Sequence, residues 1–216
     1  MFKRMAIFLG IFLACGLLAS AQEVRSEITF SGTGIFTATT TNNGLRHEAT
    51  DTGGVLASYR MNLSHWSAVE VNYGWNRNSQ EYFALGLPLS RIQSNIHQAT
   101  ADYVVKFPTA GHFRPYLLAG GGALIFDPTS RDIPLTSANI LIPPGTRVPT
   151  RAQGAFIYGG GADFDLMHRA EGKPGIALRI GYRGYVYGVP NFGFSQIDLK
   201  SWTHTAQPEA GLTFRF

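Results

Sequence analysis

Two short arrangements place a histidine near a serine, the pair that acyl-transfer enzymes use as base and nucleophile. His65 precedes Ser67 by two residues, and Ser94 precedes His97 by three. Residues three apart on a β-strand point to opposite faces, which separates Ser94 from His97. No acidic residue is obviously placed to orient His65 beside Ser67. We therefore expect neither pair to be catalytic.

A pair of carboxylates, Asp163 and Asp165, has the spacing of an acid–base pair if the segment is a strand, because both then share one face. Arg179 and Arg183 occupy the same face of the next segment, which favours structural salt bridges over catalysis. The six histidines are scattered, and no two have the spacing of metal ligands. The sequence predicts no catalytic, cofactor or metal site.

Residues 1–21 are predicted to be a secretory signal peptide. The basic start "FKR" is followed by the apolar run "MAIFLGIFLACGLL" and the small-x-small site "ASA", in the order that signal peptides show. The apolar run is shorter than the roughly 20 residues of a membrane-spanning helix. We expect cleavage after Ala21, which leaves residues 22–216 as one exported domain. A lipoprotein signal ending at Cys15 is disfavoured, because apolar residues continue beyond it.

The composition of the exported domain excludes several classes of protein. Cys15 is the only cysteine of the chain, so residues 22–216 can form neither a disulfide nor a cysteine-based metal site. Without Lys3 and Arg4, two of the 18 basic residues, 16 face 14 acidic ones. This near balance, with no basic cluster, indicates no nucleic-acid partner. The 25 glycines and the 12% aromatic residues favour strands and turns over helices.

Apolar side chains recur at every second position in eight runs, which predicts eight β-strands. One run is apolar on both faces at "YLLAGGGALIF", so the orientation of its side chains is the least defined. Glycine triplets at residues 120–122 and 159–161 lie inside two of the runs, where we expect them to ease the curvature of a sheet. The predicted strands are residues 27–38, 53–62, 67–77, 92–107, 114–127, 153–166, 175–187 and 201–216.

The connections between these runs alternate between long and short, which is the pattern of a transmembrane β-barrel with long extracellular loops and short periplasmic turns. Trp66 falls near a predicted periplasmic strand end, and Trp75 and Trp202 fall near extracellular ends, as in two aromatic girdles. The predicted fold class is therefore all-β, an eight-stranded antiparallel up-and-down transmembrane barrel. The long connections are residues 39–52, 78–91, 128–152 and 188–200.

The charged residues gather on one face once the apolar face is assigned to lipid. If Phe216 and the residues alternating with it face lipid, six acidic and six basic residues point into the lumen. An eight-stranded barrel has an interior just wide enough for side chains to fill. We therefore predict a lumen plugged by ion pairs, without a continuous water channel. The predicted lumen charges are Glu27, Arg60, Glu70, Asp102, Lys106, Arg114, Asp163, Asp165, Arg179, Arg183, Glu209 and Arg215.

Eight alternating strands after a signal peptide, with a final strand "PEAGLTFRF", resemble the small bacterial outer-membrane β-barrel family of the OmpA/OmpX type. The resemblance covers nearly all of residues 22–216. It implies a place in the bacterial outer membrane, in contact with outer-membrane lipid. It also implies that the barrel-insertion machinery reads the terminal strand as an assembly signal. The residues of that signal would be Ala210, Leu212, Phe214 and Phe216.

Some eight-stranded barrels are enzymes, such as lipid A deacylases with a His-x-Ser arrangement. The predicted topology places His65 and Ser67 in a periplasmic turn, whereas the deacylase pair acts from the other leaflet. We therefore expect a non-enzymatic, porin-like barrel with a structural or surface-interaction role. A small lipid-modifying enzyme and a narrow pore are the alternatives.

The loop at residues 128–152 is the candidate site for an extracellular partner. It contains the apolar, proline-rich stretch "ILIPPG", flanked by arginines. Long loops without secondary structure of their own are usually functional or mobile. The alternative is a loop that folds over the barrel mouth and buries its apolar residues locally. The contact candidates are Ile140, Leu141, Ile142 and Arg147.

Overall fold

The computed structural model describes residues 26–107, 111–129, 148–167 and 174–216. Nearly all of them lie in strands, and the one helical turn among them is η1 (Ser195–Ile197). Among the described residues, no helix is both long and apolar enough to span a membrane. The predicted signal peptide lies outside the described ranges. The loop candidates Ile140, Leu141, Ile142 and Arg147 also lie outside them.

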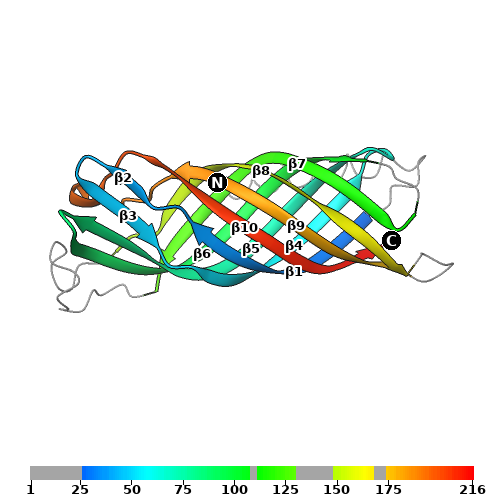
Figure 1. Ribbon diagram of the computed structural model, residues 1–216, viewed down its shortest axis with the longest axis horizontal. Coiled ribbons are helices and arrows are strands. Elements are labelled where there is room, and N and C mark those ends of the chain that lie inside the picture. The colour runs from blue at the N-terminus through cyan, green and yellow to red at the C-terminus, as the bar shows by residue number, and fades with distance from the viewer. Residues whose placement is uncertain (1–25, 108–110, 130–147, 168–173) are drawn as a thin grey trace, which may run out of the picture.

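Eight long strands form a closed barrel in which each strand is antiparallel to its neighbours. The strands follow one another around the wall, and the last pairs with the first, so that Ile28 lies opposite Phe214 (Figure 1). The eight-stranded antiparallel up-and-down barrel predicted from the sequence is thereby confirmed. Its strands are β1 (Ser26–Thr37), β4 (Thr52–Asn62), β5 (Ser67–Ala84), β6 (Leu87–Lys106), β7 (Phe113–Pro128), β8 (Arg151–Met167), β9 (Gly175–Gly188) and β10 (Trp202–Arg215).

Two further strands, β2 (Thr40–Asn42) and β3 (Leu45–Ala49), lengthen the wall at one end. β3 pairs with the end of β5, from Gln80 to Ala84. β5 has 18 residues and β6 has 20, whereas about 9–11 residues suffice to cross a membrane. We call residues 40–49 and 78–91 the strand extension; it projects from the barrel at the left of Figure 1.

The strand extension corrects the sequence prediction, which placed open loops at residues 39–52 and 78–91. Asn43 and Gly44 have φ of 51° and 74°, and Leu85 and Gly86 have φ of 50° and 80°. Two consecutive residues with positive φ make the two-residue turn of a tight hairpin. The dipeptide Asn-Gly is a strong signal for this turn, but the residues on either side of it are polar and show no apolar alternation that would predict strands. The dipeptide Leu-Gly of the second turn is not a signal for a hairpin.

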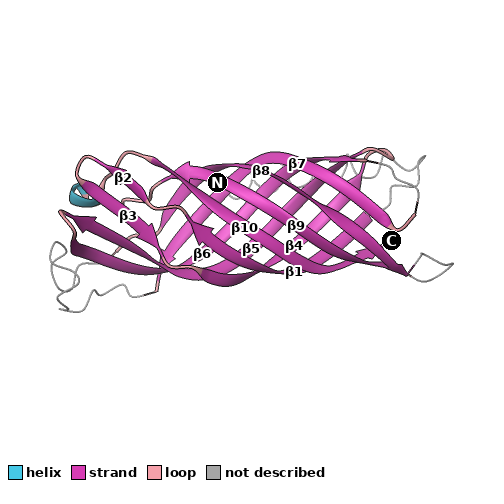
Figure 2. Cartoon of the chain, in the orientation of Figure 1, coloured by secondary structure: helices cyan, strands magenta, loops and turns pink. Residues whose placement is uncertain are grey.

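The outer wall of the barrel is apolar and the inner face carries the polar groups, the reverse of a soluble domain. Burial alternates along each strand: Phe30 is 60% exposed, while its neighbours Thr29 and Ser31 are buried. Loops are confined to the two ends (Figure 2). Large apolar side chains on the outer wall include Val55, Val71, Tyr73, Leu117, Phe156, Ile180 and Leu212.

The interior divides into two halves along the barrel axis. The half nearer the chain's C-terminal residue contains the buried charges, which are described below. The half nearer the strand extension contains a cluster of buried apolar and aromatic side chains, among them Tyr82, Phe126, Tyr187, Phe192 and Leu199. The sequence predicted a polar lumen throughout, so this apolar half is a difference from the prediction.

Candidate functional site

The interior charges reach one another because the strand register places them on adjacent inward positions. Arg60 of β4 pairs with Glu70 of β5, which in turn pairs with Asp102 of β6. Asp163 of β8 pairs with Arg179 of β9. Inward side chains recur at every second residue, so each strand contributes its charges to the same face. The result is a band of charged side chains on the inner face of the barrel wall, which we call the charged band.

Arg183 of β9 is the central cation of this band and is fully buried. Its Nη1 donates to Oδ2 of Asp102 at 2.6 Å, and its Nε donates to Oε2 of Glu209 at 3.3 Å. Its Nη2 donates to Oε1 of Glu70 on the far wall. Three carboxylates from three strands therefore share one guanidinium, and the lumen is bridged from wall to wall.

Glu70 joins this cation to two others. Its Oε2 accepts from Nε of Arg60 at 2.6 Å and from Nη1 of Arg179 at 3.1 Å. Arg179 also holds Asp163 through two hydrogen bonds, of 2.7 and 3.1 Å. Bidentate arginine–carboxylate pairs of this kind combine strength with a fixed geometry.

Tyr116 of β7 lies beside two of these cations, in the segment whose orientation was the least defined from the sequence. The guanidinium carbon of Arg60 lies 4.4 Å from the centre of its ring, and that of Arg179 lies 5.3 Å away. A desolvated cation over an aromatic face is stabilised by the ring quadrupole. Tyr116 is thus a further member of the network, and the assignment of charged residues to the lumen from the sequence did not identify it.

The network opens toward solvent at the end of the barrel that carries Phe216. Arg215 contacts Glu27 at 3.3 Å and Asp163 at 3.1 Å, and it also pairs with Asp165. Arg114 pairs with Asp165 at 2.8 Å, although its side chain is 48% exposed. Lys106 differs from the other predicted lumen bases, because it donates to the side chain of Asn62 and to the carbonyl of Ser64.

Breaking the network would be costly. Taking charges out of water is expensive, and only close partners offset the cost. Each buried guanidinium described here has at least two carboxylate partners.

Among the described residues, no three histidine, cysteine or acidic side chains form a group that would hold a metal ion.

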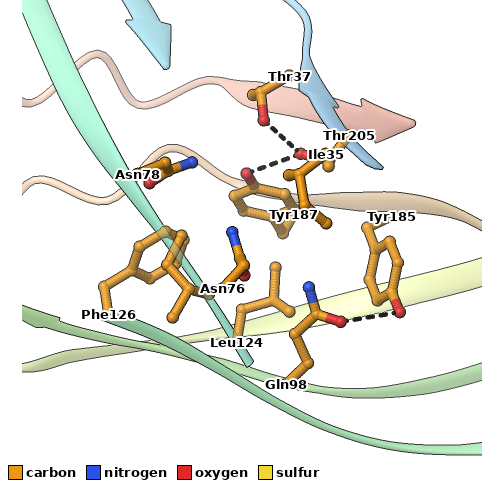
Figure 3. Close-up of a pocket in the computed structure, with 11 residues that line it drawn as sticks. Ile35, Thr37, Asn76, Asn78, Gln98, Leu124, Phe126, Tyr185, Tyr187 and Thr205 are labelled. Atoms are coloured by element: carbon orange, nitrogen blue, oxygen red, sulfur yellow. Dashed lines mark hydrogen bonds between the residues drawn. The ribbon is translucent and has the colours of Figure 1, made fainter. Parts of the chain in front are cut away.

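A small cavity inside the barrel has a mixed lining, with Asn76 and Gln98 beside Ile35 and Leu124 (Figure 3). The free space at its centre is about 10 Å³, which is room for about one water molecule. Gln98 accepts a hydrogen bond from Tyr185 at 3.2 Å. Asn76 is 1% exposed, and neither atom of its amide has a hydrogen-bond partner within the described part of the chain.

The connection between β9 and β10 covers the mouth of the barrel at the end that carries the strand extension. Phe192, Ile197 and Leu199 of this connection are fully buried in the apolar cluster. Tyr82 donates to the carbonyl of Pro190, and Asn42 donates to the carbonyl of Leu199 at 2.8 Å. The strand extension therefore holds the connection in place, and we call residues 189–201 the mouth cover. The apolar residues of this connection were the available signal in the sequence, but no pattern indicated that they lie in the lumen.

The candidate catalytic pairs do not form dyads. Ser67 bonds to Ser64 through their hydroxyls at 2.8 Å, and His65 is exposed in the turn. Ser94 is buried inside the barrel. His97 lies on the outer wall, where its Nδ1 is 2.7 Å from the hydroxyl of Tyr73.

The predicted assembly signal lies in the strand that closes the barrel. Leu212 and Phe216 are 45% and 49% exposed on the outer wall. Ala210 is also exposed, and Phe214 is half-buried. These four residues therefore share the lipid-facing side of the closing strand.

Several solved structures share this fold. Neisserial surface protein A matches with a TM-score of 0.58 and 12% identity, over 88% of this chain and 97% of its own. OprG from Pseudomonas aeruginosa matches with a TM-score of 0.52 and 12% identity, over 89% and 96%. Ail, the attachment invasion locus protein of Yersinia pestis, in complex with the heparin analogue sucrose octasulfate, matches with a TM-score of 0.50 and 16% identity, over 90% and 100%.

A search of curated proteins found no match. The family described as "Outer membrane protein beta-barrel domain" matches residues 7–216, nearly the whole chain. The resemblance to small outer-membrane barrels is thus confirmed, together with the location in the outer membrane. The closed barrel, its apolar outer wall and its salt-bridged interior agree with this match, and the chain belongs to the outer-membrane protein β-barrel family.

Proposed function

We propose that this chain is a non-enzymatic, non-conducting barrel that presents its strand extension to partners outside the cell. The observation that carries the proposal is the length of β5 and β6, which have 18 and 20 residues. About 9–11 residues cross the membrane, so much of each strand is available beyond it. β3 pairs with β5 there and widens the projecting sheet.

The closed lumen supports the non-conducting part of the proposal. Arg183 and its carboxylate partners bridge the charged half, and the mouth cover fills the apolar half. We expect the purified, folded chain to give no stepwise current in planar lipid bilayers. Reproducible single-channel steps from the folded chain would support the narrow pore instead.

The surface role requires the strand extension to lie outside the cell. Residues 22–216 contain no cysteine, so a single introduced cysteine can be labelled selectively. Leu85→Cys at the exposed tip should react with a membrane-impermeant maleimide on intact bacteria, and His65→Cys in the opposite turn should react only after lysis. The reverse pattern would overturn the assigned orientation. The loop at residues 128–152 is proposed as a second contact surface.

Ail's sulfated ligand offers no guide to the partner of this chain. Arg46 of the strand extension pairs with Glu48, and Arg91 pairs with Glu81 at 3.2 Å. These partners offset the positive charge that a polyanion would require.

A lipid-modifying activity is the second candidate function, and the unpaired positions of His65 and Ser67 disfavour it. Incubation of the folded chain with lipid A, followed by mass spectrometry, tests it. We expect the lipid to keep its mass; an acyl loss that Ser67→Ala abolishes would establish the enzyme.

For assembly, we propose removal of residues 1–21 and recognition of the closing strand by the barrel-insertion machinery. The outward positions of Leu212 on β10 and of Phe216 directly after it support this role.

A further inference from the structure

Five polar and aromatic side chains form a group on the outer wall, outside the lumen. Tyr73, Trp75 and Arg77 alternate outward along β5, while Trp75 pairs with His97 of β6 and Arg77 pairs with Asn95. Tyr73 is 54% and Trp75 41% exposed. We call these five residues the β5–β6 outer site.

The height of this site follows from two tryptophans that flank the lipid-facing part of β5. Trp66 and Trp75 are both exposed on the outer wall, with Val69 and Val71 between them. Nine residues of a tilted strand rise roughly 23 Å along the barrel axis, close to the roughly 25 Å of the apolar band. Trp75 thus marks the extracellular boundary, and Arg77 lies one outward position beyond it, at the level of lipid headgroups.

The guanidinium of Arg77 is available for an external anion. Its side chain is exposed, and within the described part of the chain no ion pair or hydrogen bond joins it to a partner. The arginines of the strand extension differ, because Arg46 and Arg91 each pair with a glutamate. An arginine at the membrane boundary without a protein partner matches the geometry of a phosphate.

The other members of the site add hydrogen-bonding groups beside this charge. The Tyr73 hydroxyl and Nδ1 of His97 are 2.7 Å apart. With Tyr73 as the donor, Nε2 of His97 carries the ring proton and is a further donor. Asn95 contributes both a donor and an acceptor opposite Arg77. This set suits a headgroup that carries hydroxyls as well as a phosphate.

We propose that the β5–β6 outer site binds the phosphorylated sugar headgroup of an outer-leaflet glycolipid of the lipid A type. Arg77 takes the phosphate, Asn95 and His97 take sugar hydroxyls, and Trp75 lies at the headgroup boundary. The site is on the outer wall, so it depends neither on the closed lumen nor on a partner of the strand extension. It rests on the proposed orientation, with the strand extension outside the cell, which the cysteine labelling tests separately from lipid binding.

The test is lipid binding to the folded chain in detergent, measured by native mass spectrometry with lipid A as the probe. Arg77→Gln should weaken binding about tenfold or more, since a charge-assisted hydrogen bond is lost. Arg46→Gln is the matched control, because it removes the same charge from an exposed arginine away from the boundary, and it should bind as the wild type does. Arg77→Lys should retain part of the affinity.

Three results would overturn the proposal. One is wild-type affinity in Arg77→Gln, and another is an equal loss in Arg46→Gln, which would indicate general electrostatic attraction. The third is equal affinity for phosphatidylglycerol, which would indicate an anionic lipid site without sugar recognition.

The mobility shift between unheated and boiled samples on a gel verifies that each variant is folded. Asn95→Ala supplies a second variant without a charge change. Asn95→Ala should weaken binding of lipid A but not of phosphatidylglycerol.

Discussion

At the scale of single residues, Arg183 makes the strongest prediction about stability. Within the described part of the chain, Arg183 is the only ionic partner of Asp102 and of Glu209, whereas Glu70 is also held by Arg60 and Arg179. Arg183→Met therefore leaves two buried carboxylates without a cation. We expect the free energy of unfolding to fall by about 3–5 kcal/mol, as measured by denaturant titration in micelles with the tryptophans as probe.

Two variants distinguish a lost network from a general effect of the substitution. Arg46→Met removes an exposed arginine of the strand extension and should change stability little. Adding Asp102→Asn and Glu209→Gln to Arg183→Met should restore part of the loss, because the uncompensated charges are gone. An equal loss in Arg46→Met, or no restoration in the combined variant, would contradict the account of the network.

His47 of β3 makes the strand extension sensitive to pH. Its ring is fully buried beside Tyr82, and its Nε2 is 2.7 Å from Oε1 of Gln80. Burial lowers the pKa of His47 below its ordinary value of 6.5, although the bond to Gln80 and the charge of Glu48 oppose the shift. A lowered pKa means that the folded extension binds fewer protons than the unfolded one below pH 6.5.

We therefore expect the strand extension to be fully stable above about pH 6.5 and to lose stability as the pH falls below it. Amide hydrogen exchange, corrected for the intrinsic effect of pH, should show weaker protection of β3 at about pH 5 than at about pH 8. His47→Gln should remove this difference, and strands in the barrel body should show none. A pH-independent β3 in the wild-type chain would refute the prediction.

At the scale of elements, inward-facing glycines allow β8 to approach its neighbours. A Cβ atom at Gly159 would lie 2.0 Å from the carbonyl oxygen of Tyr182 on β9, and one at Gly161 would lie 2.4 Å from that of Ile180. Gly32 of β1 has open space, with nothing within 4 Å. We expect Gly159→Ala to cost about 1–3 kcal/mol of unfolding free energy, measured by the same titration.

Gly32→Ala is the matched control for this prediction, because it adds the same methyl group where there is room. We expect it to change stability by less than about 0.5 kcal/mol. If both alanines cost the same, the loss would reflect glycine's backbone freedom in general, and the close approach of β8 to β9 would not be the cause.

The barrel strands could be predicted from the sequence because the lipid outside the barrel and the charged lumen inside it require very different side chains. Val71 meets lipid while its neighbour Glu70 meets arginine, so the alternation along β5 is plain. The orientation of β7 was the least defined, because its inner face at Leu118 and its outer face at Leu117 both meet apolar surroundings. The contact of Arg183 with Glu70 across the lumen depends on how the barrel closes and on the register between neighbouring strands. The residue pattern of a single strand carries no information about either.

The strand extension shows a second limit of sequence patterns. Asn78, Gln80 and Tyr82 face inward there, and polar residues also face outward, so no apolar period marks the strands. Their stability comes from specific contacts instead, such as the bond between His47 and Gln80 and the bond from Tyr82 to the mouth cover. Contacts of this kind appear only once the fold is formed.

At the scale of the whole molecule, two different barriers close the lumen in series. The mouth cover fills the half nearer the strand extension with Phe192, Ile197 and Leu199, and the charged band fills the other half. An apolar constriction excludes ions because they lose their hydration there, whereas the charged band leaves no open path because its groups are paired. The mouth cover belongs to the connection between β9 and β10, whereas the charged band consists of inward side chains of the strands themselves, so each should hold without the other.

This independence leads to a prediction for removal of the mouth cover. The amide of Val189 donates to the carbonyl of Ser201 at 2.9 Å, so the two ends of the cover are adjacent and an Asn-Gly turn can replace residues 190–200. We expect the shortened chain to remain folded and to give no current in planar bilayers, because the band around Arg183 still closes the lumen. Conductance steps in the shortened chain alone would show that the cover is the only seal and that the charged band passes ions.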